Sequence, residues 1–463
     1  MYLFILFILS LFLTIALIPV FKRMAFRVNL LDEPDPRKVH VLPMPRSGGI
    51  SMALGTLVPV LLWVNVDYNI QPILVGCGII VLFGLVDDIR NLKYTQKLMA
   101  QIAGALVVIL WGGVRIHYLG NIVSTDFEIP YFFSVGLTML FIVGVTNAIN
   151  LSDGLDGLAG GISMLSFIGI AILAYRCGNM ALTMMCAAVI GAILGFLRYN
   201  THPAIIFMGD AGSQMLGFLG AVFTLMLTQC STPYNQIMPL FLIGFPILDT
   251  LTVMVERMAK GGSPFKPDKN HFHHKLMKLG LYHSESVMTI YLLQAMFIGC
   301  AFVFRYYSNG VNLVIFSFLS GIIVLSFEVL RRKDVHFRTS RKGEPRSESI
   351  LARIKARGYA IRLVFAIFRW GLYLVVIFQS FISQEVSGAV GTVAFILIVV
   401  AFLVKRLKFV SAKEMTRITI YGSIPLICYL STFTPVSWMA PELENLNNLF
   451  LCWWLCQELL RSI

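Results

Sequence analysis

Long apolar segments recur along the chain and alternate with short polar segments. A helix needs about 20 mostly apolar residues to cross a bilayer, and these segments approach or reach that length. The pattern predicts an all-α integral membrane protein, a polytopic helical bundle with about 11 core transmembrane helices and about 4 more near the C-terminus. The core spans are expected near residues 2–21, 48–64, 72–86, 98–113, 131–149, 158–175, 180–197, 212–229, 236–255, 286–304 and 311–329, and the others near 361–380, 387–404, 417–431 and 447–460.

The distribution of basic residues predicts the orientation of these spans. Loops on the cytoplasmic side of a membrane protein carry an excess of Lys and Arg. With the N-terminus outside and fifteen alternating spans, only Arg115, Arg176 and Arg305 fall on the outer side. A single missed or invented span would invert every later loop, so this asymmetry supports the number of spans.

Composition excludes several classes of protein. Of the 463 residues, 57% are apolar and 13% are charged, whereas soluble domains average about 25% charged residues. The formal charge of +13 fits cytoplasmic loops beside an anionic leaflet, and no nucleic-acid-binding motif accompanies it. The eight cysteines form no CxxC pair, so neither a zinc cage nor a disulfide framework is indicated. The first apolar run, from Tyr2 to Val20, lacks a basic leader and a cleavage site, and is expected to be a retained helix.

Five loops on the predicted inner side carry polar residues that ordinary loops do not need. Because all five lie on one face of the membrane, we expect them to form a single site. Its candidate residues are Arg46 in the first loop, Asp87, Asp88 and Lys97 around the second, Asn150, Asp153 and Asp156 in the third, Asn200, Phe207 and Asp210 in the fourth, and His271, His273 and His274 in the fifth.

Each group has a chemical and a structural interpretation. The adjacent acids Asp87 and Asp88 suit metal-bridged phosphate binding or proton abstraction, or simply a solvated helix end. Asp210 precedes a span, so it is either an N-cap or a Mg²⁺ ligand. Glycines around Asp153 and Asp156 allow close approach to a phosphate, although a flexible turn would also contain them.

The histidine cluster does not resemble a zinc site, because Phe272 interrupts it and no cysteine lies nearby. Its imidazoles are suited to hydrogen bonds with phosphate or sugar oxygens. A generic basic loop remains the alternative. His117 and His202 are single histidines and are interpreted as structural or incidental.

Acids, glycines, histidines and basic residues at one membrane face favour phosphoryl transfer between a lipid phosphate and a cytoplasmic nucleotide. A transporter is the rival class, but its charges would lie within the spans. A prenyl-pyrophosphate enzyme would need two DDxxD motifs. Here Asp87-Asp88 is followed by Ile-Arg-Asn, with no third acid.

A family resemblance makes the hypothesis specific. The segments DEPDPRKVHVLPMPRSGG, GLVDDI, NAINLSDGLDGLAGG, FMGDAGS and HFHHKLMKLG, in this order, resemble the polyprenyl-phosphate N-acetylhexosamine-1-phosphate transferases. The resemblance implies transfer of a sugar 1-phosphate from a UDP-sugar to undecaprenyl phosphate, with release of UMP. The His-x-His-His spacing is similar to that of the bacterial GlcNAc-1-phosphate branch, which initiates lipopolysaccharide, teichoic-acid linkage or other cell-envelope polysaccharides. The phospho-MurNAc-pentapeptide transferases of peptidoglycan synthesis are the alternative within the family.

The resemblance also implies roles for individual residues. Asp210 and Asn150 would be ligands of Mg²⁺, with Mn²⁺ as an alternative ion. The implied catalytic acids are Asp87, Asp88, Asp153 and Asp156, and the implied substrate-binding residues are Arg46, Lys97, Asn200, Phe207, His271, His273 and His274.

The predicted organisation has three parts. Residues 1–330 form the membrane-embedded transferase core, 331–362 a basic cytoplasmic linker, and 363–463 an additional transmembrane segment of unknown role, which the resemblance does not cover. The expected location is the bacterial inner membrane, with the active site facing the cytoplasm. Expected partners are the UDP-sugar, polyprenyl phosphate and membrane lipids, with no nucleic acid, and a homodimer is left open.

Overall fold

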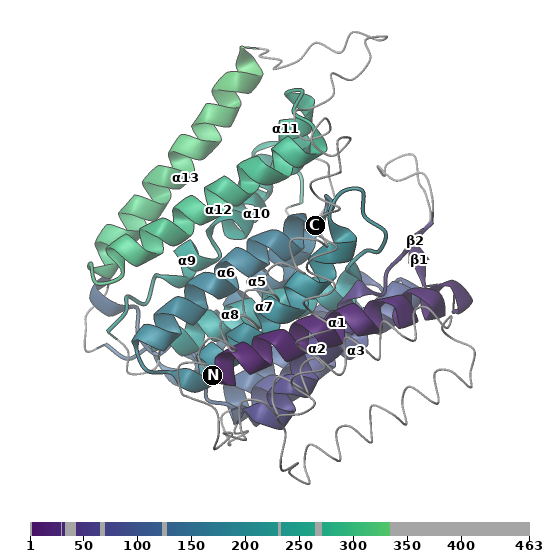
Figure 1. The fold of residues 1–463 in the computed structure, drawn as a ribbon. Helices are drawn as coiled ribbons and strands as arrows, with labels where there is room; N and C mark the ends of the chain where they lie inside the picture. The colour runs from purple at the N-terminus through teal and green to yellow at the C-terminus, as the bar shows by residue number, and fades with distance from the viewer. Residues whose placement is uncertain are drawn as a thin grey trace, which may run out of the picture. The chain divides into compact units, whose positions relative to one another are not determined.

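A computed structural model describes residues 2–28, 30–32, 43–64, 70–122, 127–229, 233–263 and 271–333. These residues belong to a compact unit that ends at Arg338 and are almost entirely helical (Figure 1). In chain order the elements are α1 (Tyr2–Arg27), β1 (Leu31–Asp32), β2 (Met44–Pro45), α2 (Gly48–Trp63), α3 (Gln71–Arg90), α4 (Tyr94–Leu106), a π-helical turn (Val107–Trp111), a 3₁₀ turn (Gly120–Ile122), α5 (Tyr131–Leu151), α6 (Leu158–Arg176), α7 (Met180–Asn200), α8 (Gly209–Gln229), α9 (Pro239–Leu242), α10 (Gly244–Ala259), α11 (Phe272–Lys278), α12 (His283–Phe304) and α13 (Asn309–Arg332).

The membrane-protein prediction is confirmed by these helices. Among the described residues, nine helical segments are long and apolar enough to cross a membrane. α2 is apolar but has only 16 residues, and α4 reaches span length by continuing through the π-helical turn to Trp111. The predicted basic linker and the four C-terminal spans lie outside the described residues and stay predictions.

One predicted span differs from the structure. The segment expected near 236–255 is the short helix α9 followed by α10, with a break at Ile243. Pro246 has no N–H to offer the carbonyl of Leu242, and its ring would clash there in a continuous helix. The side chain of Gln294 in α12 donates to Leu242 O instead, at 2.8 Å. The interruption is therefore satisfied by a neighbouring helix.

α8 lies at the centre of the bundle (Figure 1), and the whole of its apolar stretch is buried. Helices α2, α3, α5 and α6 all pack against it, while α1, α2 and α7 form a second packed group. These contacts fix the N-terminus of α8 close to the C-terminal ends of α3 and α5 and to the start of α4. The site is built at this junction of helix ends.

A short strand pairing anchors the first loop to the same junction. β1 and β2 are antiparallel, with Leu31 opposite Pro45. Pro45 O accepts a hydrogen bond from Phe207 N at 2.8 Å, and Phe207 O accepts one from Gly48 N at 3.0 Å. The first loop and the segment before α8, far apart in sequence, are thereby held together.

Candidate functional site

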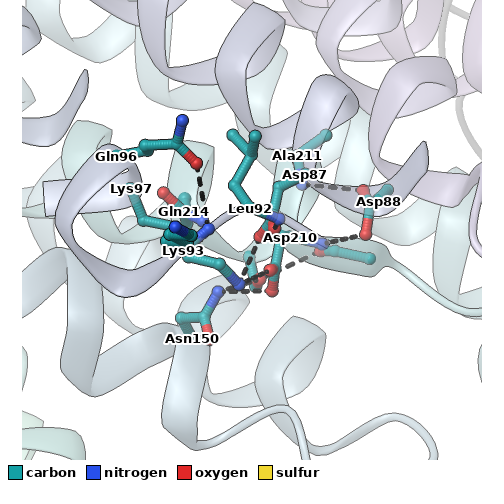
Figure 2. A network of polar contacts seen from close by, with 12 residues as sticks. Asp87, Asp88, Leu92, Lys93, Gln96, Lys97, Asn150, Asp210, Ala211 and Gln214 are labelled. Carbon is teal, nitrogen blue, oxygen red and sulfur yellow. Dashed lines mark hydrogen bonds and ion pairs between the residues drawn. The ribbon is translucent and has the colours of Figure 1, made fainter. Parts of the chain in front are cut away.

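Four side chains from four helices form the centre of the site, which we call the acid cluster: Asp87 of α3, Lys97 of α4, Asn150 of α5 and Asp210 of α8 (Figure 2). The Lys97 ammonium forms ion pairs with the carboxylates of Asp87 and Asp210; its Nζ lies 2.9 Å from Asp210 Oδ2. Asn150 Nδ2 donates to the other oxygen, Asp210 Oδ1, at 2.8 Å. The structure thus brings together residues up to 123 positions apart that the sequence had assigned to one site.

Asp87 is held from two sides. Its side chain is buried at the C-terminal end of α3, where Oδ1 accepts a hydrogen bond from Leu92 N at 2.7 Å. The chain turns at Asn91, which has a positive φ of 47° and directs the following amide back to the carboxylate. Since the other oxygen pairs with Lys97, this carboxylate has a fixed position and a local counter-charge.

Asp88 performs a different task from its neighbour. Its two oxygens accept hydrogen bonds from Asp210 N at 2.9 Å and Ala211 N at 3.1 Å, so it caps α8 from another helix (Figure 2). Gly209 makes this possible: it has a φ of +73°, and a Cβ there would lie 2.6 Å from Asp88 Oδ2. A carboxylate is favoured at a helix N-terminus by the free N–H groups and the helix dipole. Asp88 therefore positions Asp210.

The glycine-rich loop between α5 and α6 brings Asp153 near this centre. Burial, followed by the negative charges of Asp210 and Asp156, raises the pKa of Asp153 to about 7, while the charge of Arg46 opposes the rise. Arg46 itself is paired with Asp32. A carboxyl group with a pKa near neutrality can both hold and release a proton under cellular conditions.

The histidine segment packs directly on the glycine-rich loop. A Cβ at Gly154 would lie 2.4 Å from His273 Nε2, so only glycine leaves room for the imidazole. Burial is the main reason that the pKa of His273 falls to about 3. His273 is therefore a neutral imidazole, suited to hydrogen bonding and not to cationic pairing. His274 is half-buried, and its ring centroid lies 4.2 Å from that of His273.

Asp249 is a residue that sequence reasoning missed. From α10 its Oδ2 accepts a hydrogen bond from His271 Nδ1 at 2.9 Å, and its Oδ1 accepts one from Phe272 N at 2.9 Å. Both side chains of the Asp249–His271 pair are buried. Because a carboxylate oxygen accepts, His271 Nδ1 is the donor in this contact, which fixes the orientation of the ring. The available signal was an acid inside an otherwise apolar run.

Three further candidates, Asn200, Asp156 and Phe207, are engaged in contacts that connect loops. Asn200 Oδ1 accepts from Gly157 N at 2.9 Å, and its Nδ2 donates to Ile206 O at 2.9 Å. The amide of Asn200 is thus engaged within the protein. Asp156 does not join the acid cluster, because its Oδ2 contacts His202 and the backbone of Ala204. Phe207 is half-buried and is held through its backbone.

The residues of the acid cluster fit a Mg²⁺ ion. Hard divalent cations take carboxylate and amide oxygens and usually need only one or two protein ligands beside substrate phosphates. Asp210, Asp87 and Asn150 supply such groups. The Lys97 ammonium already lies between two of the carboxylates, which marks the place as one where positive charge is stabilised.

The sequence of this chain is similar to those of known proteins. Residues 70–228 match the model of glycosyl transferase family 4. The probable undecaprenyl-phosphate N-acetylglucosaminyl 1-phosphate transferase of Bacillus subtilis is 36% identical over 326 residues, which cover 70% of this chain and 90% of the relative. The chain belongs to glycosyl transferase family 4. The decaprenyl-phosphate N-acetylglucosaminephosphotransferase of Mycolicibacterium smegmatis is 32% identical over 322 residues, covering 60% of this chain and 78% of the relative.

The undecaprenyl-phosphate alpha-N-acetylglucosaminyl 1-phosphate transferase of Yersinia pestis is 30% identical over 288 residues, covering 61% of this chain and 79% of the relative. The segment matched by the glycosyl transferase family 4 model runs from α3 to α8. It contains the whole acid cluster, Asp88 and both acids of the glycine-rich loop. Arg46 and the histidine segment lie outside that segment but pack onto the same site.

Proposed function

We propose that this chain transfers N-acetylglucosamine 1-phosphate from UDP-GlcNAc to a polyprenyl phosphate, releasing UMP. The observation that carries the proposal is the acid cluster, in which carboxylates, an amide and an ammonium converge at helix ends. The names of the bacterial relatives specify undecaprenyl or decaprenyl phosphate and an N-acetylglucosaminyl 1-phosphate or N-acetylglucosamine phosphate group. They support the choice of the acceptor and of the transferred group. Two anions must meet in this reaction, and such sites need cationic clamps.

The cofactor in this proposal is Mg²⁺, held by Asp210 and Asn150. When bound, the ion would neutralise phosphate charge and favour UMP as a leaving group. Asp88 keeps Asp210 in place through the backbone of α8. The Lys97 ammonium, which pairs with Asp87 and Asp210, would pair with a phosphate oxygen of a substrate bound beside these acids. The cytoplasmic face of the bacterial inner membrane is the proposed location, because UDP-sugars are cytoplasmic substrates.

The chemical step we favour is direct attack. An oxygen of the lipid phosphate, whose proton passes to Asp87, forms a bond with the β-phosphorus of UDP-GlcNAc. The bond between that phosphorus and the bridging oxygen of UMP breaks. One phosphoanhydride replaces another, so the reaction is expected to be nearly balanced and reversible. Asp153, with its pKa near 7, is the second carboxyl group available for a proton.

The choice of UDP-GlcNAc as the donor substrate depends mainly on the histidine segment. His271 is oriented by Asp249 and His273 is neutral, so both present hydrogen-bonding groups to uncharged sugar oxygens. The His-x-His-His spacing favours a GlcNAc donor over the pentapeptide-bearing donor of peptidoglycan synthesis. Cell-envelope polysaccharide initiation is the role consistent with that donor.

The decisive experiment uses membranes or purified protein, labelled UDP-GlcNAc, polyprenyl phosphate and Mg²⁺. Release of UMP together with a labelled lipid is the expected result, and neither product would form if the chain were a transporter. Repeating the assay with UDP-GalNAc and with UDP-MurNAc-pentapeptide tests the donor. A faster reaction with the pentapeptide would refute the GlcNAc assignment.

A single variant tests the direct step. Asp87→Asn should still bind UDP-GlcNAc but should not turn over, because the proton acceptor is lost while the rest of the acid cluster remains. Binding is measured by calorimetry and turnover by UMP release. A sugar-phosphate adduct trapped on any aspartate would show a covalent intermediate and overturn direct attack.

A further inference from the structure

A second group of metal-ligating side chains lies outside the acid cluster. It consists of Asp156 in the glycine-rich loop, His202 in the segment after α7, and His283 at the start of α12, and we call it the histidine–aspartate triad. One ligand atom from each residue lies within 4.8 Å of the other two. The sequence separations of 46 and 81 residues mean that the fold, not a local motif, brings them together.

Specific contacts hold the triad in place. His202 Nδ1 lies 2.8 Å from Asp156 Oδ2, which also accepts a hydrogen bond from Ala204 N at 3.1 Å. His283 Nε2 accepts a hydrogen bond from Asp156 N at 3.1 Å. The rings of His202 and His283 stack with centroids 4.1 Å apart. All three side chains therefore converge on one small volume.

One nitrogen of the triad has no hydrogen-bond partner. His283 Nδ1 is buried and unpaired among the residues that the structure describes. When Nε2 accepts a hydrogen bond, a neutral ring carries its proton on Nδ1, and an unpaired buried N–H costs about 1–3 kcal/mol. The hydrogen bonds among the described residues therefore leave this ring incompletely satisfied. A metal ion would bind the lone pair of His283 Nε2 in place of the hydrogen bond from Asp156 N, while Nδ1 keeps its proton.

We propose that the histidine–aspartate triad binds a transition-metal ion of the Zn²⁺ type, separate from the Mg²⁺ of the acid cluster. Two imidazoles and one carboxylate are a donor set that Zn²⁺ takes in proteins, and imidazole selects against Mg²⁺. Bonds of about 2.0 Å to a tetrahedral ion would place ligand atoms about 3.3 Å apart. The Asp156–His202 contact of 2.8 Å would have to open by about 0.5 Å to accept the ion, and the ligand atoms of the triad now lie within 4.8 Å of one another.

The position of the triad indicates what the ion would do. The ion would join the glycine-rich loop, the segment before α8 and the first turn of α12. The side chain of His202 is 44% exposed and that of Asp156 is 20% exposed, so the ion would be reachable from solvent and could keep a fourth position for water. This proposal does not depend on the proposed reaction, since metal binding is measured without substrate.

The test is titration of the full-length chain, purified with a tag free of histidine, with Co²⁺ as an optical probe. An excess of Mg²⁺ fills the acid cluster during the titration. We expect one equivalent of Co²⁺ per chain, with the strong visible absorption of a four-coordinate site, and displacement by Zn²⁺. His202→Asn and His283→Gln should each weaken Co²⁺ binding at least about tenfold, since changes even to outer-shell groups cost about that much.

Two controls keep the result interpretable. His117→Asn alters another half-buried histidine that pairs with a carboxylate, Glu128, and should leave Co²⁺ binding unchanged. Asp210→Asn should also leave it unchanged while abolishing UMP release, which separates this site from the acid cluster. Thermal unfolding of each variant verifies that it is folded. Failure of the wild-type chain to bind stoichiometric Co²⁺, or equal binding by folded His202→Asn and His283→Gln, would overturn the proposal.

Discussion

The role of Asp88 indicated by the structure differs from the role expected from the sequence. The family resemblance implies a catalytic acid, whereas the structure indicates a residue that positions Asp210. In the structure both of its oxygens accept backbone hydrogen bonds at the start of α8, from Asp210 N at 2.9 Å and Ala211 N at 3.1 Å. Asp88→Asn keeps one acceptor oxygen but turns an NH₂ group toward the second amide. One hydrogen bond to a charged group is lost, and two donors then face each other.

The magnitude follows from the strength of such a bond. A hydrogen bond to a charged group contributes about 1.5–3 kcal/mol. When the whole of this loss is transmitted to Asp210, the Mg²⁺ concentration for half-maximal activity rises about ten- to hundredfold, since 1.4 kcal/mol corresponds to a factor of ten. Saturating Mg²⁺ should then restore most of the turnover number.

The assay is UMP release as a function of Mg²⁺ concentration at saturating UDP-GlcNAc and lipid phosphate. Asp249→Asn is a matched control, because Asp249 is also a buried acid with both oxygens engaged, one of them by the amide of Phe272. It should leave the Mg²⁺ dependence unchanged. If Asp88→Asn loses turnover at every Mg²⁺ concentration with an unchanged half-saturation point, Asp88 touches the reacting atoms and the positioning role is refuted.

Three other predictions concern the glycine-rich loop and the C-terminal region. The pKa of Asp153 in the folded protein is raised to about 7. The contribution of this group to stability is therefore full below its ordinary pKa and is lost as the pH rises through 7, where the buried carboxyl group ionises. Asp153→Asn should raise the melting temperature more near pH 8 than near pH 5, measured without divalent cations. Gly154→Ala should lower kcat/KM for UDP-GlcNAc by up to about 100-fold, because the added methyl group would displace His273. Truncation after about residue 340 should retain UMP release, because the described site lies entirely before that point.

Each of these has a result that would contradict it. If Asp153→Asn raised the melting temperature equally at both pH values, ionisation of the Asp153 carboxyl group would not destabilise the folded protein. Gly144→Ala, at a position with open space around the new methyl group, should be close to wild type, and equal damage from both alanines would point to a general effect on α5 and its loop. Loss of activity in a folded truncation would assign a role to the residues that follow about residue 340.

The residues of the acid cluster could be predicted from the sequence, because the distribution of basic residues along the whole chain assigns each loop to one side of the membrane. Asp87 and Asp210 belong to loops predicted on one face, and the structure joins them through Lys97. The cap formed by Asp88 could not be foreseen, since it depends on which helix end lies opposite. His202 was interpreted as structural or incidental because a lone histidine has no local pattern, and only the fold shows its contact with Asp156.

The broken helix near Ile243 illustrates the same limit. Hydropathy predicted one span across 236–255, since the run is apolar, but the position of Pro246 decides where the helix can continue. Asp249 then lies on the second piece, where it contacts His271. A hydropathy average does not register a single proline or a single acid, although both determine the geometry of the histidine segment.

The ammonium of Lys97 between two carboxylates gives the enzyme a built-in counter-ion. Without it, a resting pocket of opposed acids would attract stray monovalent cations and repel incoming phosphates. Binding of the proposed Mg²⁺ would weaken the ion pairs of Lys97, and the lysine ammonium would then be available to pair with a substrate phosphate. Binding of the metal ion and binding of the anionic substrates would thereby be coupled. The metal ion would replace Lys97 beside the carboxylates, and Lys97 would pair with a phosphate, with little net change in the charge buried at the membrane surface.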